Sequence, residues 1–202
     1  MKFDIQMYSD FQCPFCYIGK SILDTVTPDY DTEFTFKAFE IHSDAPEEGI
    51  SAKDYFGLSN IENMGKQIKD YGKKFGVDIA DLETVVNSNK ALRLAEYAKE
   101  VGKGDQYNDV MYKAMFVDKI NIGLDKDLKM LASIIGINSD EVDKVLAEPR
   151  YKNTLLDNQY YCTKNQITSV PTFIINNKVR ITGAQPPEVF REVFEKFEKG
   201  EL

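Results

Sequence analysis

The stretch that decides the fold of this chain is Asp10-Phe11-Gln12-Cys13-Pro14-Phe15-Cys16-Tyr17-Ile18-Gly19-Lys20. Apolar residues alternate over residues 2–9 before it, which predicts a strand, and the run 16–26 after it predicts a helix that ends before Pro28. Pro14 suits the first turn of that helix, where its missing N–H would have no partner. The order strand, Cys-x-x-Cys, helix therefore places Cys13 at the N-terminus of a helix.

That position has chemical consequences for Cys13. The unpaired N–H groups and the positive end of the helix dipole favour the thiolate, which is the form that attacks a disulfide. Cys16 lies one turn further along and can resolve the mixed disulfide by closing the ring onto Cys13. We therefore predict a redox-active dithiol with Cys13 as the nucleophile, Cys16 as the resolving thiol and no bound cofactor.

Two alternative interpretations of the cysteine pair are structural. Zinc normally takes four ligands, but besides the pair the chain offers only Cys162 and His42, far apart and without a zinc spacing, so we expect no metal. Two inert, buried thiols are the second alternative. Cys162 is interpreted as a buried core thiol, with a redox sensor or a glutathionylation site as the alternative. His42, the only histidine, has no evident carboxylate or serine partner and is a weak catalytic candidate.

The composition narrows the class of partner. The formal net charge of −8 argues against nucleic acid or an anionic membrane as the main partner. No window approaches the roughly 18 apolar residues that a membrane span needs. The N-terminus lacks the apolar region and cleavage site of a signal peptide, so we expect a cytoplasmic protein. The expected oligomeric state is a monomer or a homodimer. Thiols are kept reduced in that compartment, which favours a catalytic disulfide over a structural one.

The two ends of the chain carry the predicted strands. Residues 33–39 alternate again and predict a second strand parallel to the first. Residues 172–176 and 179–182 predict a hairpin with an asparagine turn, before a final helix opened by two prolines. A sheet built from both ends gives one domain, residues 1–42 and 161–202. Asp4 and Gln6 fit awkwardly in this scheme, because they are polar on a strand that is predicted to be central.

Residues 43–160 are predicted to be an insertion of helices. Amphipathic patterns separated by glycine or by Asn and Asp predict helices and no strand there. The predicted helices, the last of which extends past the insertion, are residues 60–75, 88–101, 105–118, 125–135, 139–147 and 149–165.

Together these features resemble the DsbA-like branch of the thioredoxin superfamily, and more narrowly its FrnE-type cytosolic members. The narrower resemblance rests on motifs in the family's order along nearly the whole chain. They are residues 10–19, Pro46-Glu47-Glu48-Gly49, Asn87-Ser88 with Ala91 and Arg93-Leu94, Val170-Pro171-Thr172-Phe173 and Gly183-Ala184-Gln185. The resemblance implies an α/β, thioredoxin-like fold with a large all-helical insertion domain.

The resemblance also implies functional residues. By its pattern alone Pro171 would be an ordinary strand-start proline, but in the family this proline is cis and lies beside the active-site sulfurs. The backbone of Val170 before it is implied to pair with a bound peptide, and Pro14 and Phe15 complete the substrate-binding set. Leu92 stands where many relatives have a histidine, which puts any ligand-binding role of that position in doubt. Pro-Phe separates the cysteines where strongly oxidising periplasmic relatives have Pro-His, so we expect a modest oxidant or a reductase.

We interpret the chain as a thiol–disulfide oxidoreductase acting on protein or small-molecule disulfides, with glutathione as a candidate electron partner. The alternative is a glutathione-dependent isomerase or transferase, similar to 2-hydroxychromene-2-carboxylate isomerase or the kappa-class glutathione transferases. Those relatives typically carry serine at the position of Cys13, so the cysteine pair argues against this alternative. A third interpretation is a peptide-binding chaperone whose thiols are incidental.

Overall fold

The computed structural model describes residues 1–202 and is built on a four-stranded sheet. The strands are β1 (Lys2–Ser9), β2 (Asp31–Ala38), β5 (Thr172–Ile175) and β6 (Val179–Thr182), in the order β2-β1-β5-β6. β1 and β2 are parallel and connected through α1 (Pro14–Val26) and the short 3-10 helix η1 (Thr27–Asp29), whereas β5 and β6 are antiparallel to their neighbours. Both ends of the chain therefore build one sheet, as predicted.

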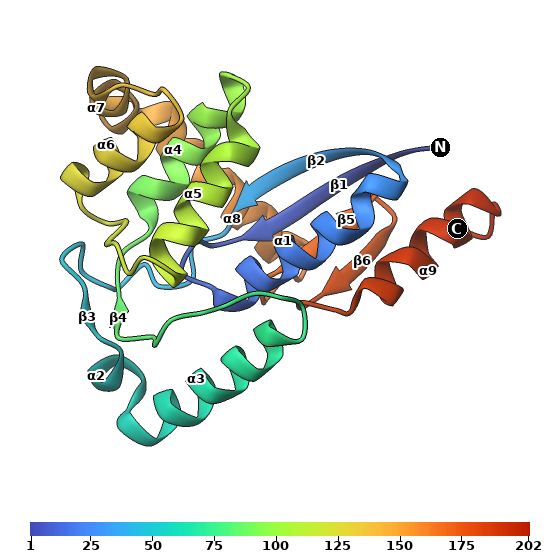
Figure 1. Ribbon diagram of the computed structural model, residues 1–202. Helices are drawn as coiled ribbons and strands as arrows, with labels where there is room; N and C mark the ends of the chain where they lie inside the picture. The colour runs from blue at the N-terminus through green and yellow to red at the C-terminus, as the bar shows by residue number, and fades with distance from the viewer.

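One face of the sheet is covered by α1 and α9 (Pro187–Glu198), which lie side by side (Figure 1). Phe3, Ile5 and Met7 of β1 are fully buried on this face. The ring of Phe3 stacks on Phe194 of α9 with centroids 4.4 Å apart. This apolar layer positions the N-terminus of α1 at the end of β1.

The opposite face of β1 explains the polar residues Asp4 and Gln6. α8 (Pro149–Lys164) packs over the C-terminal part of this face, where Tyr8 stacks on Tyr161 at 5.7 Å. Asp4 and Gln6 lie further toward the N-terminus and are half-buried. Gln6 donates to Asp4 at 3.2 Å and to Asn177 at 3.1 Å. A central strand can carry polar residues here because they keep contact with solvent and have hydrogen-bond partners.

The hairpin between β5 and β6 has the predicted asparagine turn. Asn176 and Asn177 have φ angles of 51° and 55°, which asparagine tolerates better than most residues.

The insertion is helical except for one short ladder. Its elements are β3 (Ile50–Ser51), α2 (Ala52–Phe56), α3 (Leu58–Lys73), β4 (Thr84–Val85), α4 (Asn89–Glu100), α5 (Gly104–Phe116), α6 (Asp125–Ile134) and α7 (Ser139–Ala147). β3 and β4 pair antiparallel, and the prediction included neither this ladder nor α2, because such short elements show no period. In Figure 1, α4 to α7 gather beyond the C-terminal ends of β1 and β2, and α3 lies on the other side of α1.

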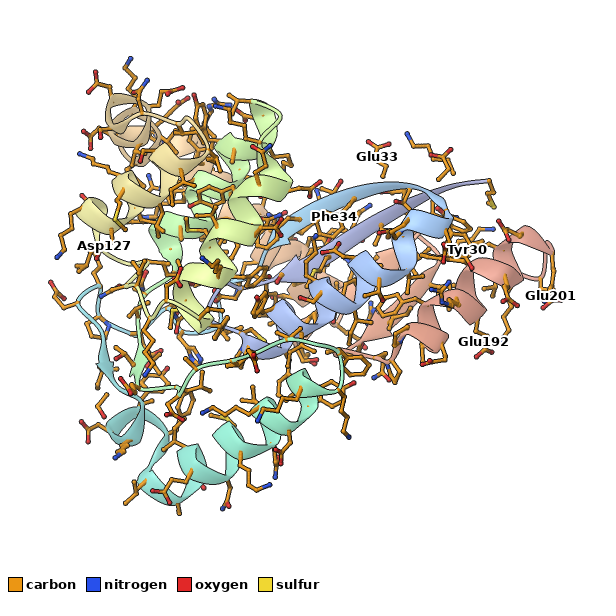
Figure 2. The ribbon with its side chains drawn as sticks, viewed as in Figure 1. Tyr30, Glu33, Phe34, Asp127, Glu192 and Glu201 are labelled. Atoms are coloured by element: carbon orange, nitrogen blue, oxygen red, sulfur yellow. The ribbon has the colours of Figure 1, made fainter.

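The insertion and the sheet share one core. A single cluster of 42 buried residues contains members of both, and the predicted domain boundary at residue 160 falls within α8. The acidic side chains of Glu33, Glu192 and Glu201 are exposed and point away from this core (Figure 2). No helix combines the length and the apolar character that crossing a membrane requires.

Candidate active site

Cys13 is the N-cap residue of α1, at the predicted place. Its carbonyl accepts hydrogen bonds from the N–H groups of Cys16 at 2.9 Å and Tyr17 at 3.3 Å, which begin the helix, and Pro14 occupies the first helical position. The side chain forms no hydrogen bond with the helix; its thiol donates to the carbonyl of Val170 at 3.6 Å instead. That the helix stabilises the Cys13 thiolate therefore stays a prediction.

The two thiols differ in their access to solvent. Cys13 is 7% exposed and Cys16 is 0% exposed, and both are free thiols. Burial raises the pKa of Cys16 well above its ordinary value, and the neighbouring Cys13 raises it further, although the Ser9 hydroxyl and the backbone of Asp10 act in the opposite direction. Cys16 is therefore held as a neutral thiol behind Cys13, and only Cys13 can be approached from outside.

The loop before β5 brings Val170 and Pro171 to the cysteines. The Val170–Pro171 peptide bond is cis, as the resemblance implied. Pro171 lies so close to α1 that a Cβ atom at Gly19 would be 3.1 Å from its Cγ atom and 3.3 Å from the ring of Phe173. A glycine at position 19 therefore allows this loop to pack beside Cys13.

Asp10 joins the cysteine loop to the loop after β2. Its carbonyl accepts from the N–H of Cys13 at 3.1 Å, and its carboxylate accepts from the N–H of Gln12 at 2.9 Å and of Ile41 at 2.7 Å. Asp10 is fully buried, and this burial raises its pKa to about 6 although the two N–H groups lower it. Through its backbone carbonyl and its carboxyl group, Asp10 thus fixes the backbone of Cys13 relative to Ile41.

Gln12 joins the same loop to the insertion. Its side chain donates to the sulfur of Met115 in α5 at 3.1 Å and accepts from the N–H of Val86 at 3.3 Å. The sequence reasoning gave neither Asp10 nor Gln12 a role. Their place directly before the cysteines was the one available signal, because their partners lie far away in the sequence.

Aromatic side chains pack around the cysteine loop and α1. Tyr112 of α5 is buried, forms a hydrogen bond with Ser9, and stacks on Tyr17 of α1 with centroids 5.6 Å apart. Phe11 stacks on Phe36 of β2 at 5.0 Å. This packing holds the insertion against the cysteine helix.

A cavity of about 180 Å³ opens beside Cys13. Its wall is mainly apolar and comes from α1, the loop after β2 and the insertion. The side chains that shape it include Phe15, Phe56, Met64, Ile68, Met115 and Phe116. A larger hollow of about 690 Å³ beside α3 contains neither cysteine and is lined by charged residues, among which Lys66 pairs with Asp70. The smaller cavity is therefore the one relevant to cysteine chemistry, and it suits an apolar group.

The remaining candidates occupy distinct environments. Cys162 is 0% exposed among Tyr8 and Ile167, and burial raises its pKa to about 12, so its predicted position in the core is confirmed. Leu92 is likewise fully buried. The structure contains no group of three or more His, Cys, Asp or Glu side chains placed to hold a metal ion.

His42 lines the cavity beside Cys13 and has the partner that the sequence did not reveal. Its Nδ1 atom lies 3.2 Å from the hydroxyl of Tyr55, which donates to Asp44 at 2.7 Å. The sequence reasoning missed Tyr55 because it lies on α2, the short helix that was not predicted.

The chain is similar to known proteins over nearly its whole length. A model of the DSBA-like thioredoxin domain matches residues 4–195. The uncharacterized protein YwbO of Bacillus subtilis is 29% identical over 208 residues, which cover 98% of this chain and 99% of that protein. The crystal structure of a probable DsbA oxidoreductase from Streptomyces coelicolor has a TM-score of 0.88 at 24% identity and covers 99% of this chain and 91% of its own.

Two solved structures with lower sequence identity are named for different activities, one as an isomerase and one as a disulfide reductase. 2-Hydroxychromene-2-carboxylate isomerase has a TM-score of 0.79 at 14% identity, covering 98% of this chain and 97% of its own. The cytosolic disulfide reductase DsbM of Pseudomonas aeruginosa, solved with GSH, has a TM-score of 0.73 at 14% identity, covering 97% and 99%. At these identities the likeness shows the fold alone. The match over residues 4–195 shows more: this chain is a member of the DSBA-like thioredoxin domain family.

Proposed function

We propose that this chain is a thiol–disulfide oxidoreductase that acts on the disulfides of proteins and peptides. The observation that carries the proposal is the unequal exposure of two cysteine residues about one helical turn apart, 7% for Cys13 and 0% for Cys16. A substrate disulfide can approach Cys13 only. Cys16 can reach only a disulfide that has already formed on Cys13, so Cys13 is the nucleophile and Cys16 the resolving thiol.

In the reducing direction, the Cys13 thiolate attacks one substrate sulfur and forms a mixed disulfide. The second substrate sulfur leaves with the electron pair of the broken bond and takes up a proton. Cys16 then loses its proton and attacks Cys13, so that the Cys13–Cys16 disulfide forms and the first substrate sulfur leaves as a thiolate. Each step is reversible, and the same residues oxidise a dithiol when the protein starts as the disulfide.

The surroundings of Cys13 support a peptide substrate. The carbonyl of Val170 lies beside the sulfur, and the cavity next to it has an apolar wall that includes Phe15. We propose that a substrate peptide runs past Val170 and Pro171 and places an apolar side chain in this cavity. Glutathione is the proposed electron partner and the cytoplasm the proposed compartment, in line with the name of DsbM, a cytosolic disulfide reductase solved with GSH.

The deciding experiment is the trapping of a mixed disulfide with native, disulfide-bonded insulin or with a disulfide-linked peptide. The Cys16→Ser variant should accumulate the adduct on Cys13, and Cys13→Ser should form none. Cys162→Ser is the matched control and should reduce insulin like the wild type. Equal trapping by both active-site variants would contradict the assigned roles.

Titration in glutathione buffers tests the direction of the reaction. Without a histidine between the cysteines, the reduction potential should lie nearer to the value of about −270 mV of thioredoxin than to the value of about −120 mV of periplasmic DsbA. A potential near the latter would show a strong oxidant and overturn this part of the proposal.

The second candidate is a glutathione-dependent isomerase or transferase. It is favoured by the fold shared with 2-hydroxychromene-2-carboxylate isomerase and by the small apolar cavity, which also suits an aromatic molecule. Cys16 has no role in that chemistry. Glutathione binding that survives Cys16→Ser, in a protein that does not reduce insulin, would select this candidate.

A further inference from the structure

His42 and Cys13 both line the small apolar cavity of about 180 Å³, and no other group in its wall exchanges a proton near neutral pH. The imidazole is held edge-to-face by Tyr55 and Phe56, with centroid distances of 5.1 Å and 5.5 Å. A substrate that fills the cavity therefore contacts both the reacting sulfur and the imidazole.

The hydrogen bonds of His42 determine which nitrogen carries the proton. The hydroxyl of Tyr55 has one proton, which it donates to Asp44. This hydrogen bond lowers the pKa of Asp44, so the carboxylate is ionised and can only accept. The Tyr55 oxygen must then accept from Nδ1 of His42, at 3.2 Å. The tautomer assigned from this network has its proton on Nδ1 and a free lone pair on Nε2.

The surroundings of the ring favour its neutral form. Burial lowers the pKa of His42, and the charge of Asp44 opposes this effect. The titratable groups next to the ring are Asp44 of its own loop and Tyr55 of α2, and Cys13 lines the same cavity. A neutral imidazole whose Nδ1 proton is held by a hydrogen bond keeps Nε2 free to act as a general base; here the acceptor is the Tyr55 hydroxyl, which Asp44 orients in turn.

We propose that His42 is the general base and general acid of disulfide exchange at Cys13, oriented by Tyr55 and Asp44. This inference rests on the proposed function. Nε2 takes the proton of the Cys13 thiol, directly or through one water, and so forms the thiolate that attacks the substrate disulfide. The new S–S bond forms, the substrate S–S bond breaks, and the leaving sulfur takes the proton from the imidazolium. The ring ends neutral, and no further reactant is needed.

Asp10 links the backbone of Cys13 to the backbone next to His42. Its carbonyl accepts from the N–H of Cys13, and its buried carboxylate accepts from the N–H of Ile41, the residue before His42. The nucleophile and the proposed base are therefore fixed to the same residue. This observation is independent of the hydrogen bonds of the imidazole.

The test is the kinetics of disulfide exchange by His42→Asn, whose side-chain amide can keep the hydrogen bond to Tyr55 but cannot serve as a base. We expect kcat/KM for insulin reduction to fall about 100-fold and the His42 inflection in its pH profile to disappear. Reduction of dithionitrobenzoate should fall less, because its leaving thiolate needs no proton and only the base step is lost. An equal loss with both substrates would overturn the general-acid role, and no loss with either would overturn the inference.

Two further variants separate catalysis from folding. In Tyr55→Phe the aromatic packing remains and the hydroxyl that accepts from Nδ1 and donates to Asp44 is lost, so we expect a smaller loss in kcat with KM unchanged. In His42→Ala the cavity gains room, and added imidazole should restore part of the insulin reduction. If Cys16→Ser traps substrate while His42→Asn, verified as folded by its unfolding transition, reduces insulin like the wild type, the inference fails and the proposed function stands. If Cys16→Ser traps no mixed disulfide and the wild type does not reduce insulin, the proposed function itself fails.

Discussion

The carbonyl oxygen of Val170 accepts a hydrogen bond from the thiol of Cys13 at 3.6 Å, although the two residues are 157 positions apart. Val170 itself is half-buried at the rim of the site. A charge on its side chain would therefore lie close to the sulfur that reacts.

We expect Val170→Asp to slow the reaction of Cys13 with the anion iodoacetate more than with the neutral iodoacetamide. The added carboxylate repels the anion by about 1 kcal/mol, which is a factor of about 5 between the two reagents. Val170→Thr has nearly the same shape without the charge and should leave the ratio of the two alkylation rates unchanged. A ratio that is the same in the Asp variant and the wild type would show that this side chain does not face the approaching reagent.

A second prediction concerns the close contact of α1 with Pro171. Gly19→Ala places a methyl group 3.1 Å from Pro171 and 3.3 Å from Phe173, both of which are packed in place. Overpacking costs about 1–3 kcal/mol, whereas the gain in helix propensity is about 1 kcal/mol, so we expect the free energy of unfolding to fall by about 1 kcal/mol.

The matched control for this substitution is Gly65→Ala in α3, where no atom lies within 4 Å of the added methyl group. The propensity gain is unopposed there, and the free energy of unfolding should rise by about 0.5–1 kcal/mol. Urea denaturation measures both variants. A stabilised Gly19→Ala variant would show that the loop of Pro171 can move to make room for the methyl group.

Asp10 predicts a specific dependence of stability on pH. Its pKa in the folded protein is about 6, above the ordinary value of 3.8, so folding favours the protonated form. This contribution to stability is fully present below about pH 4 and is lost as the pH rises through about 6. Lowering the pH from about 7 to about 4 should therefore stabilise the wild type by about 2 kcal/mol relative to Asp10→Asn.

The comparison between the two proteins isolates Asp10 from the other carboxyl groups, because those are common to both. Urea unfolding at a series of pH values gives the difference. A difference that is constant over this range would mean that the two N–H groups that donate to Asp10 cancel the effect of its burial on its pKa.

Cys162 is expected to be unreactive toward alkylating reagents in the native protein. It is fully buried and its pKa is raised to about 12, so it should resist iodoacetamide while Cys13 reacts. Mass spectrometry after brief labelling should find the label on Cys13, and labelling in denaturant should modify all three cysteines. Rapid native labelling of Cys162 would revive the redox-sensor interpretation.

Local patterns in the sequence were sufficient to predict the sheet and the position of Cys13. The alternation over β1, the proline after Cys13 and the asparagines of the hairpin turn each specify a backbone conformation within a few residues. The helices of the insertion followed from their 3.6-residue period, with ends within about three residues of those found.

The contacts around the cysteines could not be predicted in this way. Gln12 reaches Met115 and Val86, and His42 reaches Tyr55, through side chains whose meeting depends on how distant segments pack. β3, β4 and α2 are too short to show a period. Asp4 and Gln6 remained unexplained because the sequence does not show how far α8 extends over the second face of the sheet.

The pairing of β1 with β5 has a consequence for biosynthesis. Ile5 lies opposite Ile175, so the ribosome must make about 170 further residues before β1 receives its second neighbour. At a translation rate of about 5–20 residues per second, one edge of the nascent β1 stays unpaired, and Cys13 uncovered, for roughly 10–30 seconds. During translation this chain therefore presents both an aggregation-prone edge and a reactive thiol, and it depends on the emergence of its last 30 or so residues to hide them.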